Sequence, residues 1–342
     1  MKINSLESLR GVAALCVVLY HLPAISFYHF SKGLFGVYFF FCLSGFVIAL
    51  NYFDRIKNLK SFLNFEKKRF LRLYPLHILV LFLVLIIQIS KLYLVDFLPI
   101  KYEEKAFQPQ EWFTSLDFIQ HIFLIQSVTN LGYPFSWNGA AWTISVEFYV
   151  YIVFASLIIL IRNNQVVFST IIIIYLFFFE IIFNFLKPFI NYFFLDGLRY
   201  FLTGSLTFII YRLIKFRFSD FFVILSLFFI IFFNEFLPNY IFYSLIILII
   251  SIQKDNNYIH RLLNKNYFVY FGTISYSFYM IHFINFYLFN QILKLLNINF
   301  YSAADNYNII LDTVFTAIYL ISTTLLSILL YKNIENRFRA KI

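Results

Sequence analysis

The sequence predicts an all-α membrane protein, a polytopic bundle of about ten transmembrane helices with both termini in the cytoplasm. Of the 342 residues, 61% are hydrophobic and only 13% are charged, and the mean hydropathy is +0.79. Soluble domains average about 45–50% apolar and about 25% charged residues. The apolar runs are about 20 residues long and do not alternate, which favours helices over the strands of a barrel.

Ten apolar segments are expected to form these helices. They are residues 6–27, 34–53, 72–91, 141–161, 166–186, 196–213, 219–234, 238–253, 267–290 and 308–331. Most of the 27 Lys and Arg residues fall in the loops that face the cytoplasm when both termini are inside, as the positive-inside rule requires. No linker or internal repeat divides the chain, so residues 1–342 are predicted to form a single membrane domain without a fused soluble domain.

Charge and cysteine content exclude two classes of partner. The net charge of +10 could indicate nucleic-acid binding, but the basic residues cluster in short loops between apolar runs. Cys16 and Cys42 fall in apolar segments and lack the spacing of metal ligands. We therefore expect membrane lipid around the protein, no nucleic acid and no metal.

The long segment 92–140 is expected to lie on the membrane surface. All three tryptophans, Trp112, Trp137 and Trp142, fall in it or beside it, and tryptophan favours the membrane–water interface. Within it, residues 116–126 are predicted to form a short interfacial helix.

Arg10 and His21 are the most informative pair in the chain. They lie eleven positions apart in the first apolar segment, which is about 16 Å along a helix and nearly the same face. Ionisable groups inside membrane helices often mark a site, and an imidazole is the usual general base near neutral pH. The pair alone equally allows a histidine bonded to a neighbouring carbonyl at a helix end.

Two further segments carry intramembrane or membrane-edge charge. Arg69 and Arg72 are three residues apart, share one helix face and suit a phosphate or pyrophosphate group, although topology and lipid contact also explain them. Glu147 lies about two turns inside its helix, at a depth similar to that of His21. It is expected to meet and orient that imidazole, or alternatively to form a structural pair with a buried cation or tyrosine.

A late segment provides a second imidazole. Ser275, Tyr279 and His282 form one helical stripe, with His282 predicted at the depth of His21. These side chains either contact substrate or hold helices together. Ser44 and Gly45 are predicted to mark a close helix contact.

In their order along the chain, these blocks resemble the acyltransferase-3 family of integral membrane acyltransferases, the type that O-acetylates bacterial surface polysaccharides. The matching blocks are Arg10 with His21, the stretch FFFCLSGFVI, the basic run that ends in Tyr74-Pro75, the segment from Trp142 to Glu147, and SYSFYMIH. The last block of the family usually reads Glu-x-Pro, whereas Asn336 and Arg337 follow Glu335 here, so the resemblance supports no role for Glu335.

The resemblance implies a multi-pass protein of the bacterial inner membrane that transfers an acyl group, most often acetyl. The donor is cytoplasmic acyl-CoA, a co-substrate rather than a bound cofactor, and the acceptor is a hydroxyl of an extracytoplasmic glycan such as O-antigen, capsule or exopolysaccharide. His21, Arg10 and Glu147 are the implied catalytic residues, and Arg69 and Arg72 are the implied donor-binding residues. The remaining implied contacts, to the oxyanion or the substrate, come from Ser275, Tyr279 and His282.

Two other classes share these features. A transporter or flippase of a lipid-linked glycan is also polytopic with intramembrane charge, but it predicts discontinuous helices and a repeated half. The unrelated MBOAT acyltransferases also use histidine, but in a late helix. Direct transfer and a covalent acyl-histidine are both compatible with the sequence.

Overall fold

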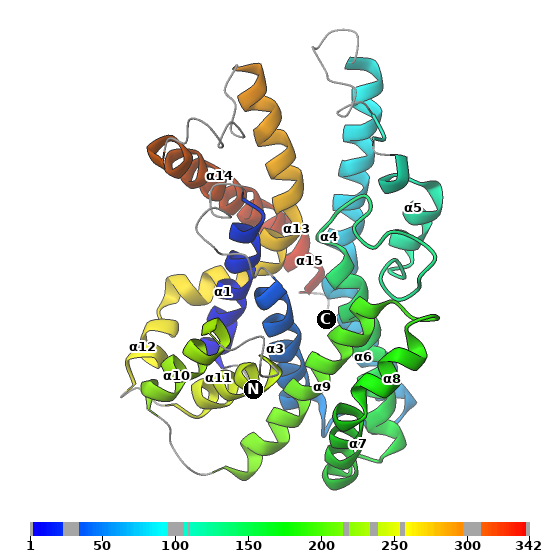
Figure 1. Ribbon diagram of the computed structural model, residues 1–342, viewed down its shortest axis with the longest axis vertical. Coiled ribbons are helices and arrows are strands. Elements are labelled where there is room, and N and C mark those ends of the chain that lie inside the picture. Colours follow the sequence, from blue (N-terminus) through cyan, green and yellow to red (C-terminus); the bar gives the residue numbers. More distant parts are fainter. Residues whose placement is uncertain are drawn as a thin grey trace.

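The computed structural model describes residues 3–22, 34–94, 106–108, 110–214, 219–232, 239–253, 257–296 and 309–339, and these residues form an all-α bundle (Figure 1). A helix forms in each of the ten predicted segments, although residues 23–27, 233–234, 238 and 308 of those predictions lie outside the described residues. The corresponding helices are α1 (Asn4–Tyr20), α3 (Leu34–Tyr52), α4 (Leu59–Leu94), α6 (Trp142–Leu160), α7 (Gln165–Phe177) with α8 (Phe179–Leu186), α9 (Tyr192–Leu213), α10 (Asp220–Phe232), α11 (Asn239–Ile252), α13 (Asn266–Leu295) and α14 (Ile309–Leu330).

Shorter elements complete the chain. They are a 3₁₀-helix, η2 (Gln110–Trp112), the α-helices α5 (Ser115–Ile122) and α12 (Tyr258–Leu263), a π-helix, η3 (Tyr331–Glu335), and the final α-helix α15 (Asn336–Arg339). The last two extend α14 beyond its predicted end, so the chain continues as helix through Glu335.

Two predicted boundaries were wrong. The fifth predicted helix is two helices, α7 and α8, bent by 70°, because Phe178 leaves helical geometry with φ −93° and ψ 13°. Helix α4 starts at Leu59 rather than residue 72 and runs through Pro75. Its start is fixed by Asn58, whose side chain accepts the Ser61 backbone N–H at 3.0 Å, so the basic run lies inside the helix rather than before it.

Fewer than ten helices of the described residues are long and apolar enough by themselves to cross a membrane. Among the described residues, five helices are long and apolar enough to cross a membrane, or six if α7 and α8 form one span. Helices α1, α10 and α11 have 17, 13 and 14 residues, which is short of the ~20 residues that span the hydrocarbon core. The fold is therefore a multi-pass membrane bundle, and the count of ten spans is not confirmed.

Helices α1 and α3 lie at the centre of the bundle, between α13 and α14 on one side and α4, α6 and α9 on the other (Figure 1). Helix α3 crosses α9 closely: a Cβ atom at Gly45 would overlap the carbonyl oxygen of Phe201, and one at Gly204 would overlap that of Cys42. Small residues let helix backbones approach in this way. The prediction of a close contact at Gly45 is confirmed.

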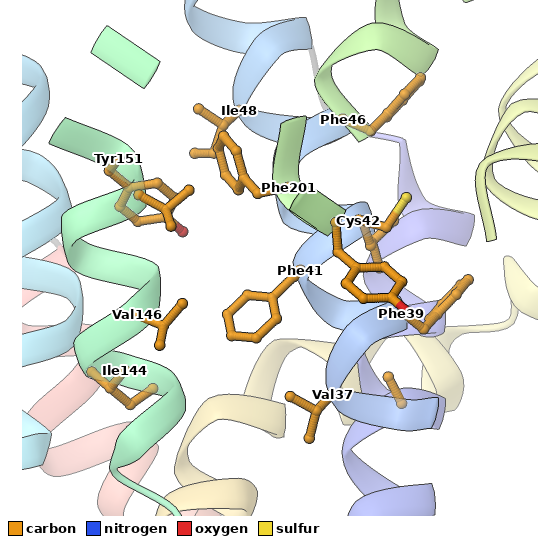
Figure 2. Close-up of a cluster of buried hydrophobic side chains, with 14 of the residues drawn as sticks. Val37, Phe39, Phe41, Cys42, Phe46, Ile48, Ile144, Val146, Tyr151 and Phe201 are labelled. Carbon is orange, nitrogen blue, oxygen red and sulfur yellow. The ribbon is translucent and has the colours of Figure 1, made fainter. Parts of the chain in front are cut away.

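The apolar core fills the space between α3, α6 and α9. Phe41 and Val146 are fully buried, and Phe41 points from α3 toward Val146 of α6 (Figure 2). This packing fixes how α6 is rotated against α3, and it therefore determines which α6 side chains face the centre of the bundle.

The described part of the segment between α4 and α6 contains α5, which lies beside α4 (Figure 1). Its helix α5 ends at Ile122, earlier than predicted, and its polar residues Asp117, Gln120 and His121 are buried while Leu116 and Ile119 are each 51% exposed. An outward apolar face of this kind suits contact with lipid. Two of the three tryptophans, Trp137 and Trp142, are buried rather than lying on the surface.

Candidate active site

The site is arranged along α1, which presents a new side chain to the bundle centre at each turn. Arg10 is followed by Ala13 and Ala14, then by Val17, and His21 caps the C-terminal end of the helix. Three regions follow the same order and are described in turn: a charged cluster around Arg10, a narrow apolar passage beside Ala13 and Val17, and a wider cavity beside His21.

The charged cluster consists of Arg10, Arg72, Glu147 and Glu335. Within it, Glu147 is 2% exposed and accepts hydrogen bonds from Ser44 of α3, at 3.1 Å, and from Tyr151 one turn further along α6. The Tyr151 bond matches the alternative in which Glu147 pairs with a buried tyrosine. Tyr151 lies four residues after Glu147, so the two share a helix face in the sequence.

Two arginines provide the positive charge of this cluster. Arg10 forms an ion pair with Glu7, at 3.4 Å, and lies over the Phe40 ring. Arg72 attracts Glu7, Glu147 and Glu335 electrostatically but makes no ion pair within 4 Å among the described residues. These carboxylates attract the Arg72 guanidinium without forming an ion pair with its N–H groups.

Arg69 lies three residues before Arg72 on α4, about one helical turn earlier. It donates to the Tyr52 hydroxyl at 3.1 Å and stacks over the Tyr52 and Phe65 rings, while its buried Nε lacks a partner among the described residues. Both arginines interact electrostatically with Tyr151. That Arg69 and Arg72 share one face for an anionic group stays a prediction.

Glu335 is the residue that sequence reasoning missed. It is 2% exposed, accepts from Ser277 of α13 at 2.8 Å, and pairs with Arg339 at 3.3 Å. Its carboxylate attracts Arg72 and Arg10. The missing proline concealed this role, whereas a glutamate near the end of an apolar helix was itself the available signal.

The apolar passage separates the charged cluster from His21. It is a cavity of about 30 Å³ lined by α1, α3, α6 and α13, with Ala13, Val17, Gly36, Thr143 and Tyr279 among its walls. Gly36 is required there, because a Cβ atom would lie 2.7 Å from the Ala13 carbonyl oxygen. The passage is only wide enough for a few non-hydrogen atoms.

His21 opens onto a larger cavity of about 320 Å³, the His21 cavity. Its Nδ1 lies 2.8 Å from the Val17 carbonyl oxygen. A carbonyl can only accept, so Nδ1 carries the hydrogen and Nε2 presents a lone pair. The bond to a neighbouring carbonyl and an accessible basic nitrogen, which the sequence left as alternatives, therefore occur together.

The expected contact between His21 and Glu147 was wrong. Glu147 is bonded to Ser44 and Tyr151 in the charged cluster, and the Val17 carbonyl fixes the His21 tautomer instead. The expected depth of Glu147 was the error, because its carboxylate interacts with Arg10, eleven residues before His21 along α1, and not with the helix end where His21 lies. The structure joins Glu147 to Arg10 and Arg72 electrostatically.

His282 is the residue that the structure places against His21. The two ring centroids are 5.3 Å apart, and His282 Nδ1 is bonded to the Tyr279 carbonyl. Its Nε2 is buried and has no partner among the described residues. By the same reasoning as for His21, this nitrogen carries a lone pair, so two neutral bases meet at one place.

The other two residues of the α13 stripe differ in what they can offer. The Tyr279 hydroxyl lies 3.1 Å from Thr143 Oγ1, and Tyr279 lines both the apolar passage and the His21 cavity. Ser275 donates to the Gly272 carbonyl at 2.7 Å. Its hydrogen is already used within its own helix, which leaves Tyr279 as the better donor to a reacting group.

The described residues thus place a charged cluster and a pair of imidazoles in one membrane bundle, with a small apolar cavity between them. The model of the acyltransferase-3 family, an acyltransferase domain, matches residues 3–332, and the chain belongs to this family. It is a membrane acyltransferase, which decides against the transporter reading. No curated protein and no solved structure matches the chain. Glu335 lies just beyond the matched residues.

Proposed function

We propose that this protein transfers an acyl group, acetyl by preference, from cytoplasmic acyl-CoA to a hydroxyl of an extracytoplasmic glycan in the bacterial inner membrane. The observation that carries the proposal is the order of the regions along α1: cationic cluster, narrow apolar passage, imidazole cavity. Acyl-CoA is polyanionic at one end and carries a slender arm with the thioester at the other, so it fits this order of polarity.

The donor phosphates bind at Arg69 and Arg72 in this proposal. Arg72 makes no ion pair with a described residue, and Arg69 has an unpartnered Nε. Guanidinium forks bind phosphate oxygens with charge-assisted hydrogen bonds worth about 1.5–3 kcal/mol each. Arg10 and Glu147 belong to the same cluster, so their role is to hold its charges in place beside the donor rather than to act on His21.

The acyl transfer takes place at His21. Its Nε2 takes the proton of the acceptor hydroxyl while the hydroxyl oxygen attacks the thioester carbonyl carbon. The carbon–sulfur bond then breaks, and the imidazolium returns its proton to the departing thiolate, which balances the reaction. General-base help of this kind contributes about 10²–10⁴-fold. The Tyr279 hydroxyl, at the boundary of passage and cavity, donates to the oxyanion.

His282 allows a second route with the same residues. If His21 Nε2 attacks the thioester carbonyl carbon first, the carbon–sulfur bond breaks, the CoA thiolate leaves and an acyl-imidazolium forms, so His21 can no longer act as a base. His282 Nε2, unpartnered and beside it, then accepts the hydroxyl proton while the hydroxyl oxygen attacks the acyl carbon and the bond from that carbon to His21 Nε2 breaks. His282 passes the proton on to the CoA thiolate. A burst of CoA release that precedes glycan acylation would identify this covalent route.

The donor site is tested by replacing both arginines. With purified protein, Arg69→Ala combined with Arg72→Ala should raise the KM for acetyl-CoA at least about tenfold, because two charge-assisted contacts are lost. Arg261→Ala, an exposed arginine of α12, is the matched control and should leave the KM unchanged. An unchanged KM in the double variant would show that Arg69 and Arg72 do not bind the donor and only set the orientation of the protein in the membrane.

A further inference from the structure

A second cavity lies next to the His21 cavity and is not used by the reaction described above. It has a volume of about 330 Å³ and is enclosed by α4, α13 and the segment 112–139. We name it the Trp137 cavity. Its characteristic side chains are Gln88, Trp112, Tyr133, Trp137, Asn138 and Tyr287.

The two cavities share three lining residues. Phe135, Gly139 and Phe283 line both. The Phe283 ring lies 4.7 Å from the His21 ring and 4.4 Å from the His282 ring, measured between centroids. A Cβ atom at Gly139 would stand 3.0 Å from Phe283 Cζ, so glycine leaves room for this ring at the boundary.

The aromatic walls of the Trp137 cavity are held by hydrogen bonds. The Trp137 indole donates to the Thr114 carbonyl at 3.2 Å, and its backbone N–H donates to the Trp112 carbonyl at 3.1 Å. Trp112 stacks on Tyr133 with the rings 5.6 Å apart and is itself 41% exposed. A fixed aromatic surface therefore lies beside the reaction site and is partly accessible.

We propose that the Trp137 cavity is a binding subsite for a second sugar, the neighbour in the glycan chain of the sugar that is acylated beside His21. This inference rests on the proposed function. It implies that the acceptor is a chain of at least two sugars and that a single sugar is a poor acceptor.

Size and chemistry of the walls support a neutral sugar. Each cavity lies at the lower end of the range of about 300–1,000 Å³ for small-molecule sites, which suits one sugar ring in each. The C–H face of a sugar ring carries partial positive charge and packs on the negative face of an aromatic ring. The amides of Gln88 and Asn138 can exchange hydrogen bonds with sugar hydroxyls.

A charged sugar and a lipid tail fit less well. None of the described residues that line the cavity is Asp, Glu, Lys or Arg. A phosphorylated or acidic sugar would therefore find no charged partner among these lining residues, although the Lys91 ammonium lies behind one of them, 4.5 Å from the centroid of the Tyr287 ring. A prenyl chain in the cavity would bury the amides of Gln88 and Asn138 away from water without offering them hydrogen bonds. Burying unpaired polar groups in this way costs free energy.

The test uses the natural acceptor and a pair of variants. Glycan from a strain that lacks this protein is hydrolysed to fragments of one and two sugars, and each is offered to the purified protein with acetyl-CoA. We expect the two-sugar fragment to have a kcat/KM about tenfold above that of the single sugar. Trp112→Ala should remove most of this advantage, by about five- to tenfold, and leave the single sugar unchanged.

Two further variants keep the result interpretable. Phe123→Ala removes an exposed aromatic side chain of the same segment outside the cavity and should preserve the two-sugar advantage. Tyr287→Ala, on α13, should reduce the advantage as Trp112→Ala does. It tests the same cavity from another helix, so the inference can still be tested if Trp112→Ala does not fold.

Three outcomes would overturn the inference. Equal kcat/KM for one and two sugars would exclude the subsite while leaving the proposed function intact. A loss in Trp112→Ala that appears only when the fragment carries a prenyl-phosphate would assign the cavity to lipid. Failure of every fragment to release CoA would count against the proposed function, and the subsite would fall with it.

Discussion

The charged cluster and the His21 cavity lie toward opposite ends of α1 and differ in how their polar groups are partnered. In the charged cluster, carboxylates meet guanidinium and hydroxyl groups, as when Glu335 accepts from Ser277 and Arg339. At the His21 cavity, the buried His282 ring packs behind the His21 ring, neither imidazole is bonded to a carboxylate of the described residues, and His282 Nε2 has no partner among them. In the charged cluster, ionised side chains have partners that favour the charged form. Beside the His21 cavity, the two imidazoles each keep one nitrogen that can accept a proton.

This difference separates binding from chemistry. In a cluster of buried charges, removal of one partner leaves an uncompensated charge and destabilises the fold. An imidazole whose tautomer is fixed by a backbone carbonyl is ready to accept a proton at its other nitrogen. Substitutions in the two regions should therefore produce different losses, and the following experiments are given in order of expected effect.

The largest effect is expected in the His21 cavity. His21→Ala should reduce glycan acylation by about 10²–10⁴-fold because the general base is lost. Its melting temperature should stay close to that of the wild type, since the imidazole bonds only to its own helix. His260→Ala on α12 is the matched control. Acylation at the normal rate in His21→Ala would show that His21 is not the general base.

The charged cluster should show the reverse pattern. Glu335→Gln keeps the Ser277 contact but removes the charge that compensates Arg339 and Arg72, at a cost of about 1–3 kcal/mol. The variant should unfold at a lower temperature, as measured by intrinsic fluorescence in detergent, while retaining measurable turnover. Glu180→Gln, an exposed glutamate of α8, should not shift the transition. Unchanged stability in Glu335→Gln would show that the carboxylate is not a structural member of the cluster.

The smallest effect is expected at the passage that joins the regions. A methyl group at Gly36→Ala meets the Ala13 carbonyl oxygen and the Val17 side chain, so it narrows the passage. Turnover with acetyl-CoA should fall several-fold, and turnover with propionyl-CoA should fall further because its chain is bulkier. Equal losses with both donors would mean that the acyl group does not use this passage.

Much of the fold was predictable because each helix is an apolar run of sufficient length. The break at Phe178 was not, since neither proline nor glycine marks it. The early start of α4 was missed because the polar residues before Arg72 read as a loop, whereas the Asn58 cap makes them helical. The apolar pattern therefore predicts which segments are helical, whereas the exact helix ends and bends depend on single residues.

Less of the candidate site was predictable, for a geometric reason. Depth along a helix follows from residue number, so His21 and His282 were correctly expected at one level. Glu147 was expected at that level too, but the structure places it in the charged cluster beside Ser44 and Tyr151, because the depth of a residue also depends on where its helix begins and how the helix is tilted. Glu335 was missed because Ser277, which it accepts from, lies 58 residues away in the chain.

The central claim is that an acyl group enters on the side of the charged cluster and leaves on the side of His21. It is tested with protein in sealed vesicles sorted for one orientation, with labelled acetyl-CoA supplied only on the side of the charged cluster and deacylated glycan only on the other. The account predicts labelled glycan on the His21 side, and none when His21→Ala is used. Label transferred only when donor and glycan share one side would contradict it.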